Sequence, residues 1–350
     1  MSKPFRVTLT ADFQQNGELI YQDVGLDILE SADGVDYAFM PNHTPEVTSG
    51  QLADTDAVIA LSPRFTASSL EDIEDLTVIS RFGVGYDSVD VDACTESDVL
   101  LTITRGGVNH SVAEATIAFM LAISHNLLIK DRLTREGRWD DRGQHMGSEL
   151  RDRTLGIVGF GGIGSTLAEM IGGFGMGSVL VHDPYVTSQS AEASGVELVS
   201  LDELMKRSDF VSINCPLNDE TRDLIGSSEL GLMKPTAYLI NTARGGIVNE
   251  SALIDVLSNR TIAGAALDCH ETEPFPAGHP MADLDNVILA PHAIAWTNEL
   301  FRDLGRMCCR QVLDISQGVV PEGVVNADVL ERPVFRSKLD KLRELSTARS

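Results

Sequence analysis

Aromatic residues are scarce in this chain, and no apolar run is long enough to cross a bilayer. Aromatics make up 5% of the 350 residues, whereas the apolar share reaches 43%. This aliphatic-rich balance favours sheets covered by helices over an aromatic-rich β-sandwich. The most apolar helix-like stretch is residues 115–123, and the first ten residues contain no apolar signal core. We therefore expect a cytoplasmic protein that makes no membrane contact.

Positive charge is also scarce, with 27 Lys and Arg against 52 Asp and Glu and a net charge of -25. Such a surface repels nucleic-acid phosphates and anionic lipids, so we expect neither as a partner. An anionic substrate would need locally placed cations, and Arg81 and Arg244 lie in apolar or glycine-rich surroundings. The five cysteines are odd in number and lack CxxC spacing, which indicates reduced thiols rather than disulfides or a metal site.

Two series of short apolar runs alternate with polar or helical stretches, first within residues 6–103 and again within residues 155–289. This rhythm predicts an α/β protein with two doubly wound parallel sheets. Between them, residues 111–139 have capping-box spacing and a helical period, which predicts one long helix. That helix could join the domains and form a dimer contact, or be buried within one chain. After Arg332 we expect a charged tail with little apolar patterning.

A glycine motif follows the first strand of the second series. Gly159, Gly161 and Gly164 stand in GxGxxG register between an apolar strand and a helical pattern, and Asp183 ends the next strand 19 residues after Gly164. This context predicts a dinucleotide pyrophosphate at the helix N-terminus and a carboxylate on the ribose. Because a carboxylate repels a 2'-phosphate, NAD is expected rather than NADP. A glycine-rich turn without a ligand is the alternative.

Four ionisable residues lie at or after predicted strand ends of the second sheet: Arg244, Asp268, Glu273 and His292. Strand ends of a parallel sheet converge on one crevice. Reduction of a 2-oxo acid needs a cation for the carboxylate, a proton donor for the C2 oxygen, and a group that keeps this donor charged. Arg, His and Glu can supply these functions. Taken singly, each could instead be a surface ion pair, a buried histidine or a helix cap.

The ordered motifs resemble those of the D-isomer-specific 2-hydroxyacid dehydrogenases, which include glyoxylate/hydroxypyruvate reductases and phosphoglycerate dehydrogenases. They are RFGVGYDSVD, GFGGIG, HDPY, CPLNDETRDLI, NTARGGIVNE, ALDCHETEP and APHAIAWT. The resemblance implies a flavodoxin-like substrate/catalytic domain of residues 1–105 plus 296–335 and a Rossmann NAD-binding domain of residues 106–295. Residues 336–350 would form a C-terminal tail. A homodimer that acts on a small anionic 2-oxo or 2-hydroxy acid is expected.

The resemblance also implies the function of individual residues. His292 would be the general acid/base, Glu273 would hydrogen-bond His292, Arg244 would bind the substrate carboxylate and carbonyl, and Asp268 would tune the site electrostatically. Other candidate substrate-binding residues are Val84 and Gly85, through their backbone, and Ser62, Arg64 and Trp296. The candidate cofactor-binding residues are Gly159, Gly161, Gly162, Ile163, Gly164, Asp183, Cys215, Pro216, Thr242, Ala243, Asp268 and His292.

Two departures and two alternatives stay open. Asn214 lies where many relatives carry His, and His270 lies where Phe is usual. A 3-phosphoglycerate dehydrogenase would need cations for the phosphate, for which Arg64 and Arg81 are candidates. A corepressor-like NAD(H)-binding interaction protein of the same fold would retain the same motifs. Turnover of a 2-oxo acid with NADH would distinguish an enzyme from such a binding protein.

Overall fold

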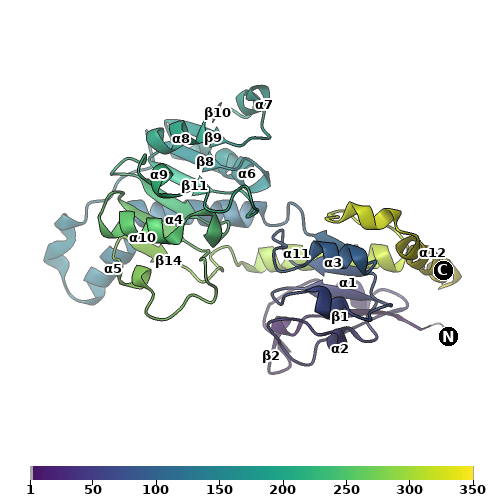
Figure 1. Ribbon diagram of the computed structural model, residues 1–350. Coiled ribbons are helices and arrows are strands. Elements are labelled where there is room, and N and C mark those ends of the chain that lie inside the picture. Colours follow the sequence, from purple (N-terminus) through teal and green to yellow (C-terminus); the bar gives the residue numbers. More distant parts are fainter. Residues whose placement is uncertain (1–2, 350) are drawn as a thin grey trace. The chain divides into compact units, whose positions relative to one another are not determined.

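The computed structural model describes residues 3–349 and divides the chain into two compact units (Figure 1). Among the described residues, unit 1 comprises residues 3–108 and 296–349, and unit 2 comprises residues 109–295. The expected boundary between residues 295 and 296 coincides with a division between the units. The other division follows residue 108, three residues beyond the expected boundary after residue 105. The terminal positions 1 and 350 of the expected domains lie outside the described residues.

Unit 1 contains a five-stranded parallel sheet in the order β4–β1–β5–β6–β7. Counted within the unit, this is the flavodoxin-like order that the resemblance implied. The strands are β1 (Phe5–Leu9), β4 (Val35–Phe39), β5 (Ala57–Ala60), β6 (Val78–Arg81) and β7 (Leu100–Ile103). A short antiparallel hairpin, which the sequence analysis did not predict, consists of β2 (Gln14–Gln15) and β3 (Glu18–Leu19).

Helices cover both faces of this sheet. One face packs against α11, which also contacts α1, and the other face packs against α2, α3 and η2. The helices of unit 1 are α1 (Leu26–Glu30), α2 (Ser49–Leu52), α3 (Val91–Glu96), α11 (Asn298–Ser316), α12 (Pro333–Arg349), η1 (Ala11–Phe13), η2 (Ala67–Leu70) and η7 (Ala327–Glu331). Buried Gln311 of α11 accepts hydrogen bonds from Ser80 (2.7 Å) and Thr102 (2.9 Å), which fasten this helix to β6 and β7.

The expectation of a C-terminal tail is wrong for the described residues. Residues 333–349 form helix α12, which packs against α11. Phe335 is fully buried and Leu339 nearly so, while Lys338 donates to the backbone carbonyls of Leu76 and Asp98 at 2.8 and 3.2 Å. The apolar side chains are few, but their helical spacing gives α12 a buried stripe beneath its charged surface.

Unit 2 contains a seven-stranded parallel sheet in the order β10–β9–β8–β11–β12–β13–β14. The order reverses between β8 and β11, as in Rossmann folds. The strands are β8 (Thr154–Val158), β9 (Ser178–His182), β10 (Glu197–Leu198), β11 (Phe210–Ile213), β12 (Tyr238–Asn241), β13 (Gly264–Leu267) and β14 (Val287–Leu289). The edge strand β10 is two residues long.

Two apolar cores lie on opposite faces of this sheet, so the carboxyl ends of the strands are left to the loops. One core includes side chains of α4 and α6, and the other includes side chains of α8, α9 and α10. The helices of unit 2 are α4 (Asn109–Ser124), α5 (Leu127–Arg135), α6 (Gly162–Met170), α7 (Ser188–Ala193), α8 (Leu201–Arg207), α9 (Ser227–Leu230), α10 (Glu250–Ser258), η3 (Trp139–Gln144), η4 (Ile171–Phe174), η5 (Gly245–Ile247) and η6 (Pro280–Asp283).

The single long helix expected over residues 111–139 is also wrong, because the chain turns between α4 and α5 by 57°. Asn126 takes a left-handed backbone conformation there, with φ of 53°, and its Nδ2 donates to the carbonyl of Met146 at 3.0 Å. The N–H of Ser148 donates to the carbonyl of Ser124, at the end of α4. Among the described residues no single helix could span a membrane, although α4 and α5 taken together meet the criteria of length and composition.

Candidate active site

The glycine turn between β8 and α6 leaves open space beside Gly161, at the exposed N-terminus of α6. Gly159 has a φ of 93°, and a Cβ there would lie 2.6 Å from the backbone nitrogen of Cys215. A Cβ on Gly164 would lie 2.3 Å from the carbonyl oxygen of Gly159. In contrast, a Cβ on Gly161 would have no atom of the described residues within 4 Å, its chain neighbours apart. The exposed N-terminus of α6 beside Gly161 therefore fits a dinucleotide pyrophosphate.

Asp183 follows β9 and is fixed beside this turn. Its Oδ2 accepts a hydrogen bond of 2.7 Å from the backbone N–H of Phe160, inside the glycine motif. Its Oδ1 accepts one of 2.8 Å from the N–H of Tyr185. The carboxylate thus lies close to the pyrophosphate position, as a ribose-binding carboxylate of a Rossmann fold should.

The other predicted cofactor residues follow neighbouring strands at the same edge of the sheet. Cys215 comes after β11 and is half-buried, and burial raises the pKa of its thiol to about 11, so it remains neutral. Pro216 beside it is exposed, and Thr242 after β12 lies 3.1 Å from the hydroxyl of Thr116 on α4. Asn214, the departure from His, donates from Nδ2 to Ser212 Oγ (2.9 Å), on its own strand. Its amide nitrogen is therefore engaged within β11.

The loop that carries Arg244 is held by the buried side chain of Asn241 at the end of β12. Asn241 Nδ2 donates to the carbonyl of Arg244 at 2.8 Å, and its Oδ1 accepts from the N–H of Ala243 at 3.0 Å. Arg244 Nη1 donates to the Ala243 carbonyl at 2.7 Å. A Cβ on Gly245 would lie 2.0 Å from the carbonyl carbon of His270. The glycine therefore lets the Arg244 loop pack directly on the loop that follows β13.

His292 and Glu273 form a hydrogen-bonded pair between the loops after β14 and β13. His292 Nδ1 lies 2.8 Å from Glu273 Oε2, and Glu273 Oε1 accepts from the N–H of His270 at 2.9 Å. Burial by itself would raise the pKa of Glu273, but these two hydrogen bonds and the charge of His292 bring it below its usual value. The carboxylate is thus ionised and holds Nδ1, which leaves Nε2 for a substrate oxygen.

Asp268 fixes the backbone around His292. Its carbonyl accepts from the N–H of His292 at 2.8 Å, and its Oδ1 accepts from the N–H groups of Ala293 (2.9 Å) and Ile294 (3.1 Å). Burial raises the pKa of Asp268 in spite of these donors. His292 has a φ of 54°, which is uncommon for a residue with a side chain, and the bonds to Asp268 hold it there.

Comparison with known proteins gives the same assignment at the level of the family. A model of the D-isomer specific 2-hydroxyacid dehydrogenase NAD binding domain matches residues 117–293. A glyoxylate reductase from Korarchaeum cryptofilum is 36% identical over 285 residues, which cover 80% of this chain and 86% of the relative. This chain belongs to the D-isomer specific 2-hydroxyacid dehydrogenase family.

Further members of the family match over most of the chain. A D-3-phosphoglycerate dehydrogenase from Methanocaldococcus jannaschii is 37% identical over 320 residues, or 91% of this chain, but the match spans only 59% of that relative. The solved TT0316 protein from Thermus thermophilus aligns with a TM-score of 0.81 and 28% identity, covering 91% of this chain and 99% of the other. The expected family and its two-sheet α/β fold with an NAD-binding Rossmann unit are confirmed.

In this family member, the remaining predicted substrate residues belong to unit 1. Val84 and Gly85 lie half-buried in the loop after β6. Ser62 and Arg64 are exposed after β5, and the N–H of Ser62 donates to Asp12 Oδ2 at 2.8 Å. All four positions lie where strands of the parallel sheet end, so their loops share the carboxyl edge of unit 1.

Trp296 is no core residue. Half of it is exposed, and its ring lies edge-on to Tyr21 and Phe301, with centroids 6.0 and 5.1 Å away. Phe301 also contacts Phe82, which begins the loop after β6, at 5.3 Å. Trp296 therefore forms the exposed end of an aromatic cluster that reaches the β6 loop.

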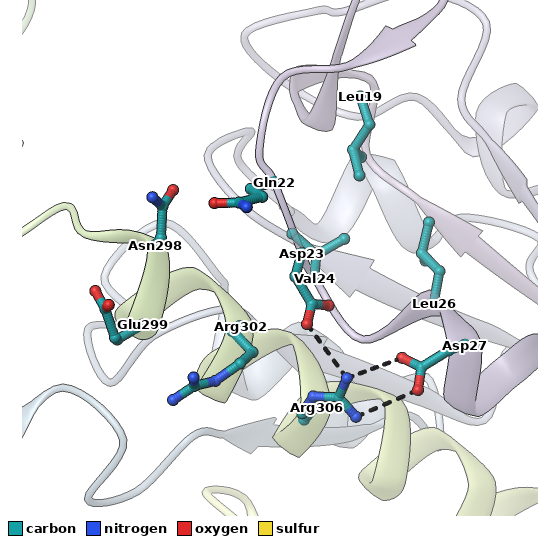
Figure 2. A pocket seen from close by; sticks show the side chains of 10 residues that line it. All are labelled: Leu19, Gln22, Asp23, Val24, Leu26, Asp27, Asn298, Glu299, Arg302 and Arg306. Carbon is teal, nitrogen blue, oxygen red and sulfur yellow. Dashed lines mark hydrogen bonds and ion pairs between the residues drawn. The ribbon is translucent and has the colours of Figure 1, made fainter.

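Unit 1 also contains a surface pocket of about 610 Å³ between α11 and the segment around α1, but its cations are engaged (Figure 2). Figure 2 shows Arg306 of α11 directed at Asp23 and Asp27, each 3.2 Å away. Arg302 pairs with Asp303 at 2.8 Å. A carboxylate is paired with each arginine. These side chains therefore serve to hold α11 against the segment around α1 rather than to bind an anion.

Sequence analysis assigned no role to Asn241 or Cys269 and left His270 open. Cys269 Sγ donates to the Ala243 carbonyl at 3.2 Å, the same oxygen that Arg244 contacts. His270 is buried, and its Nε2 lies 2.8 Å from the carbonyl of Ala290. It thus ties the loop after β13 to the segment leading into His292. Of these three residues, only Asn241 could have been noticed in the sequence, because it is a polar residue at the end of an apolar strand.

Proposed function

We propose that this protein is an NAD-dependent dehydrogenase that transfers a hydride between nicotinamide and C2 of a small 2-hydroxy or 2-oxo acid of the D-isomer type. The observation that carries the proposal is the 2.8 Å pair of His292 and Glu273. Glu273 of this pair lies on the loop after β13, which packs against the Arg244 loop, and both residues belong to the unit that contains the glycine turn. A proton donor, its charged partner and a cation thus occur in the NAD-binding unit.

Each side chain has a defined function in this reaction. Bound NADH supplies the hydride for reduction, and NAD accepts it in the reverse direction. Arg244 binds the substrate carboxylate and carbonyl. His292 Nε2 donates a proton to the C2 oxygen during reduction and takes one during oxidation. Glu273 stabilises the charged imidazole, and such a positioned donor contributes roughly 10² to 10⁴ in rate.

The cofactor preference is proposed to be NAD over NADP. The carboxylate of Asp183 is fixed beside the glycine turn and would repel a 2'-phosphate. No Lys or Arg occurs between Asp183 and Lys206 to compensate for this charge. Steady-state rates with both cofactors test the preference, and a higher kcat/KM with NADPH would overturn it.

Glyoxylate, hydroxypyruvate or a similar small acid is the proposed substrate, in line with the Korarchaeum relative. The similarity to a D-3-phosphoglycerate dehydrogenase supports a second candidate. Arg64 is exposed after β5 and could reach a phosphate there. Salt-sensitive use of a phosphorylated substrate that is lost in Arg64→Ala would favour this second candidate.

A panel of 2-oxo acids assayed with NADH, together with two variants, tests the proposal. His292→Ala should lose turnover by orders of magnitude while its affinity for NADH stays within about twofold of wild type, since His292 acts on the substrate oxygen. Glu273→Gln should retain the hydrogen bond but lose the charge, and so reduce kcat by roughly tenfold or more. Wild-type rates in His292→Ala would refute the mechanism. No turnover of any acid by the wild-type protein would favour the corepressor-like alternative.

We further propose a homodimer and a cytoplasmic location. Exposed apolar side chains gather on α5, η3 and the following loop: Leu127, Leu128, Trp139 and Met146 are 50% to 79% exposed. A second copy of this chain would cover them. Five free cysteines fit a reducing compartment. Light scattering tests the dimer, and a monomer at micromolar concentration would contradict it.

A further inference from the structure

A thiol, a carboxylate and an imidazole converge where the loops after β13 and β14 meet. One donor atom from each of Cys269, Glu273 and His292 lies within 4.8 Å of the other two. These are the ligand types that Zn²⁺ prefers, and three of them leave a fourth position for water. All three residues belong to unit 2, so the cluster is complete within one compact unit.

Cys269 is not needed for the proposed reaction. Proton transfer uses His292 and Glu273, and carboxylate binding uses Arg244. The thiol is buried, with 3% of the residue exposed, whereas the side chains of His292 and Glu273 are 41% and 36% exposed. A cation can therefore enter from the side of the catalytic pair and meet the sulfur at the inner end of the cluster.

Two carboxyl groups lie at the cluster and favour a cation there. Glu273 Oε2 lies 2.8 Å from His292 Nδ1, and Asp268 Oδ1 accepts from the N–H groups of Ala293 and Ile294, which follow His292. Arg244 opposes a cation, but its Nη1 donates to the Ala243 carbonyl, the same oxygen to which the Cys269 thiol donates. Zinc bonds of about 2.0 to 2.3 Å require the three donor atoms, which lie within 4.8 Å of one another, to draw closer together.

We propose that Cys269, Glu273 and His292 form an inhibitory site for a thiophilic divalent cation such as Zn²⁺. The metal replaces the proton that His292 Nδ1 shares with Glu273 and takes the thiolate of Cys269 as its third protein ligand. The protons displaced from Nδ1 and from the thiol leave to solvent. With the metal on Nδ1, the imidazole keeps its Nε2 proton and no longer cycles between imidazolium and imidazole, so the ion blocks turnover. This loss of activity rests on the proposed dehydrogenase function, whereas metal binding itself does not.

The test measures binding without turnover, on the full-length protein with Zn²⁺ and Cd²⁺ as probes. Zn²⁺ affinity is obtained by competition with a chromophoric chelator, and Cd²⁺ reports sulfur ligation through its thiolate charge-transfer band in the ultraviolet. We expect one equivalent to bind with that band. Cys269→Val should lose the band and weaken Zn²⁺ binding by roughly 100-fold. Cys94→Ala removes a buried thiol from unit 1 and should change none of these readouts.

Equal Zn²⁺ affinity in wild type and Cys269→Val, or no Cd²⁺–thiolate band in wild type, would overturn the proposal. Should Cys269→Val fold poorly, Cys269→Ser keeps the size of the side chain and must still lose the band. Metal binding without turnover of any 2-oxo acid would refute the proposed function and leave the site intact. Turnover that resists stoichiometric Zn²⁺ would refute the inhibitory site and leave the dehydrogenase intact.

Discussion

Replacing Gly161 by alanine should separate cofactor binding from folding. No atom of residues 3–349, apart from the two chain neighbours, lies within 4 Å of the new Cβ, and the backbone at Gly161, with φ of -75° and ψ of -158°, is extended. We expect the free energy of unfolding to stay constant or to rise by about 0.4 to 1 kcal/mol, because alanine restricts the unfolded chain. The methyl group would occupy the approach of the pyrophosphate. Losing two hydrogen bonds to a charged group costs roughly 3 kcal/mol or more, or about 100-fold in Kd for NADH.

Gly164→Ala is the matched control with the opposite outcome. Its Cβ would lie 2.3 Å from the carbonyl of Gly159 and 3.1 Å from Ile157, so β8 and α6 would have to move apart. Overpacking of roughly 1 to 3 kcal/mol should lower Tm by about 2 to 12 °C. The assays are fluorescence titration with NADH and thermal melting without cofactor. Tight NADH binding by Gly161→Ala, or melting as early as that of Gly164→Ala, would refute the reasoning.

Two further predictions concern stability. Asp268→Asn keeps an oxygen for the N–H groups of Ala293 and Ile294 but removes a buried charge. Folding raises the pKa of Asp268, so the wild-type protein loses stability as pH rises from the unfolded-state pKa through the folded-state pKa. The variant should melt above wild type at pH 8, and this gap should close towards the unfolded-state pKa near ~3.9; an equal gap at both pH values would contradict it. Phe335→Ala empties a fully buried site under α12 and should cost roughly 3 to 5 kcal/mol, or about 6 to 20 °C in Tm; an unchanged Tm would show that α12 does not support unit 1.

The apolar runs predicted the sheets well because a buried parallel strand needs no information beyond its own side chains. Residues 210–213, for example, are buried on both faces and form β11, within the second series of apolar runs. The break between α4 and α5 is different. The helical period continues through Asn126, but the chain turns there because residues 145–148 bond to Asn126 and to the end of α4. Such contacts come from a later segment and leave no trace in the local period.

The candidate site divides along the same line. Arg244, Glu273 and His292 could be predicted because they follow strands whose carboxyl ends meet at one edge. The packing between their loops could not, because it depends on pairs far apart in sequence: Gly245 admits the backbone of His270, and Asp268 bonds Ala293. The same packing brings the thiol of Cys269 to the proton-transferring pair, although the sequence indicated only a reduced thiol at this position. A sequence pattern therefore identifies the side chains that carry out proton transfer and substrate binding. The proposed metal site depends in addition on the packing of the loops after β13 and β14, which the sequence pattern does not contain.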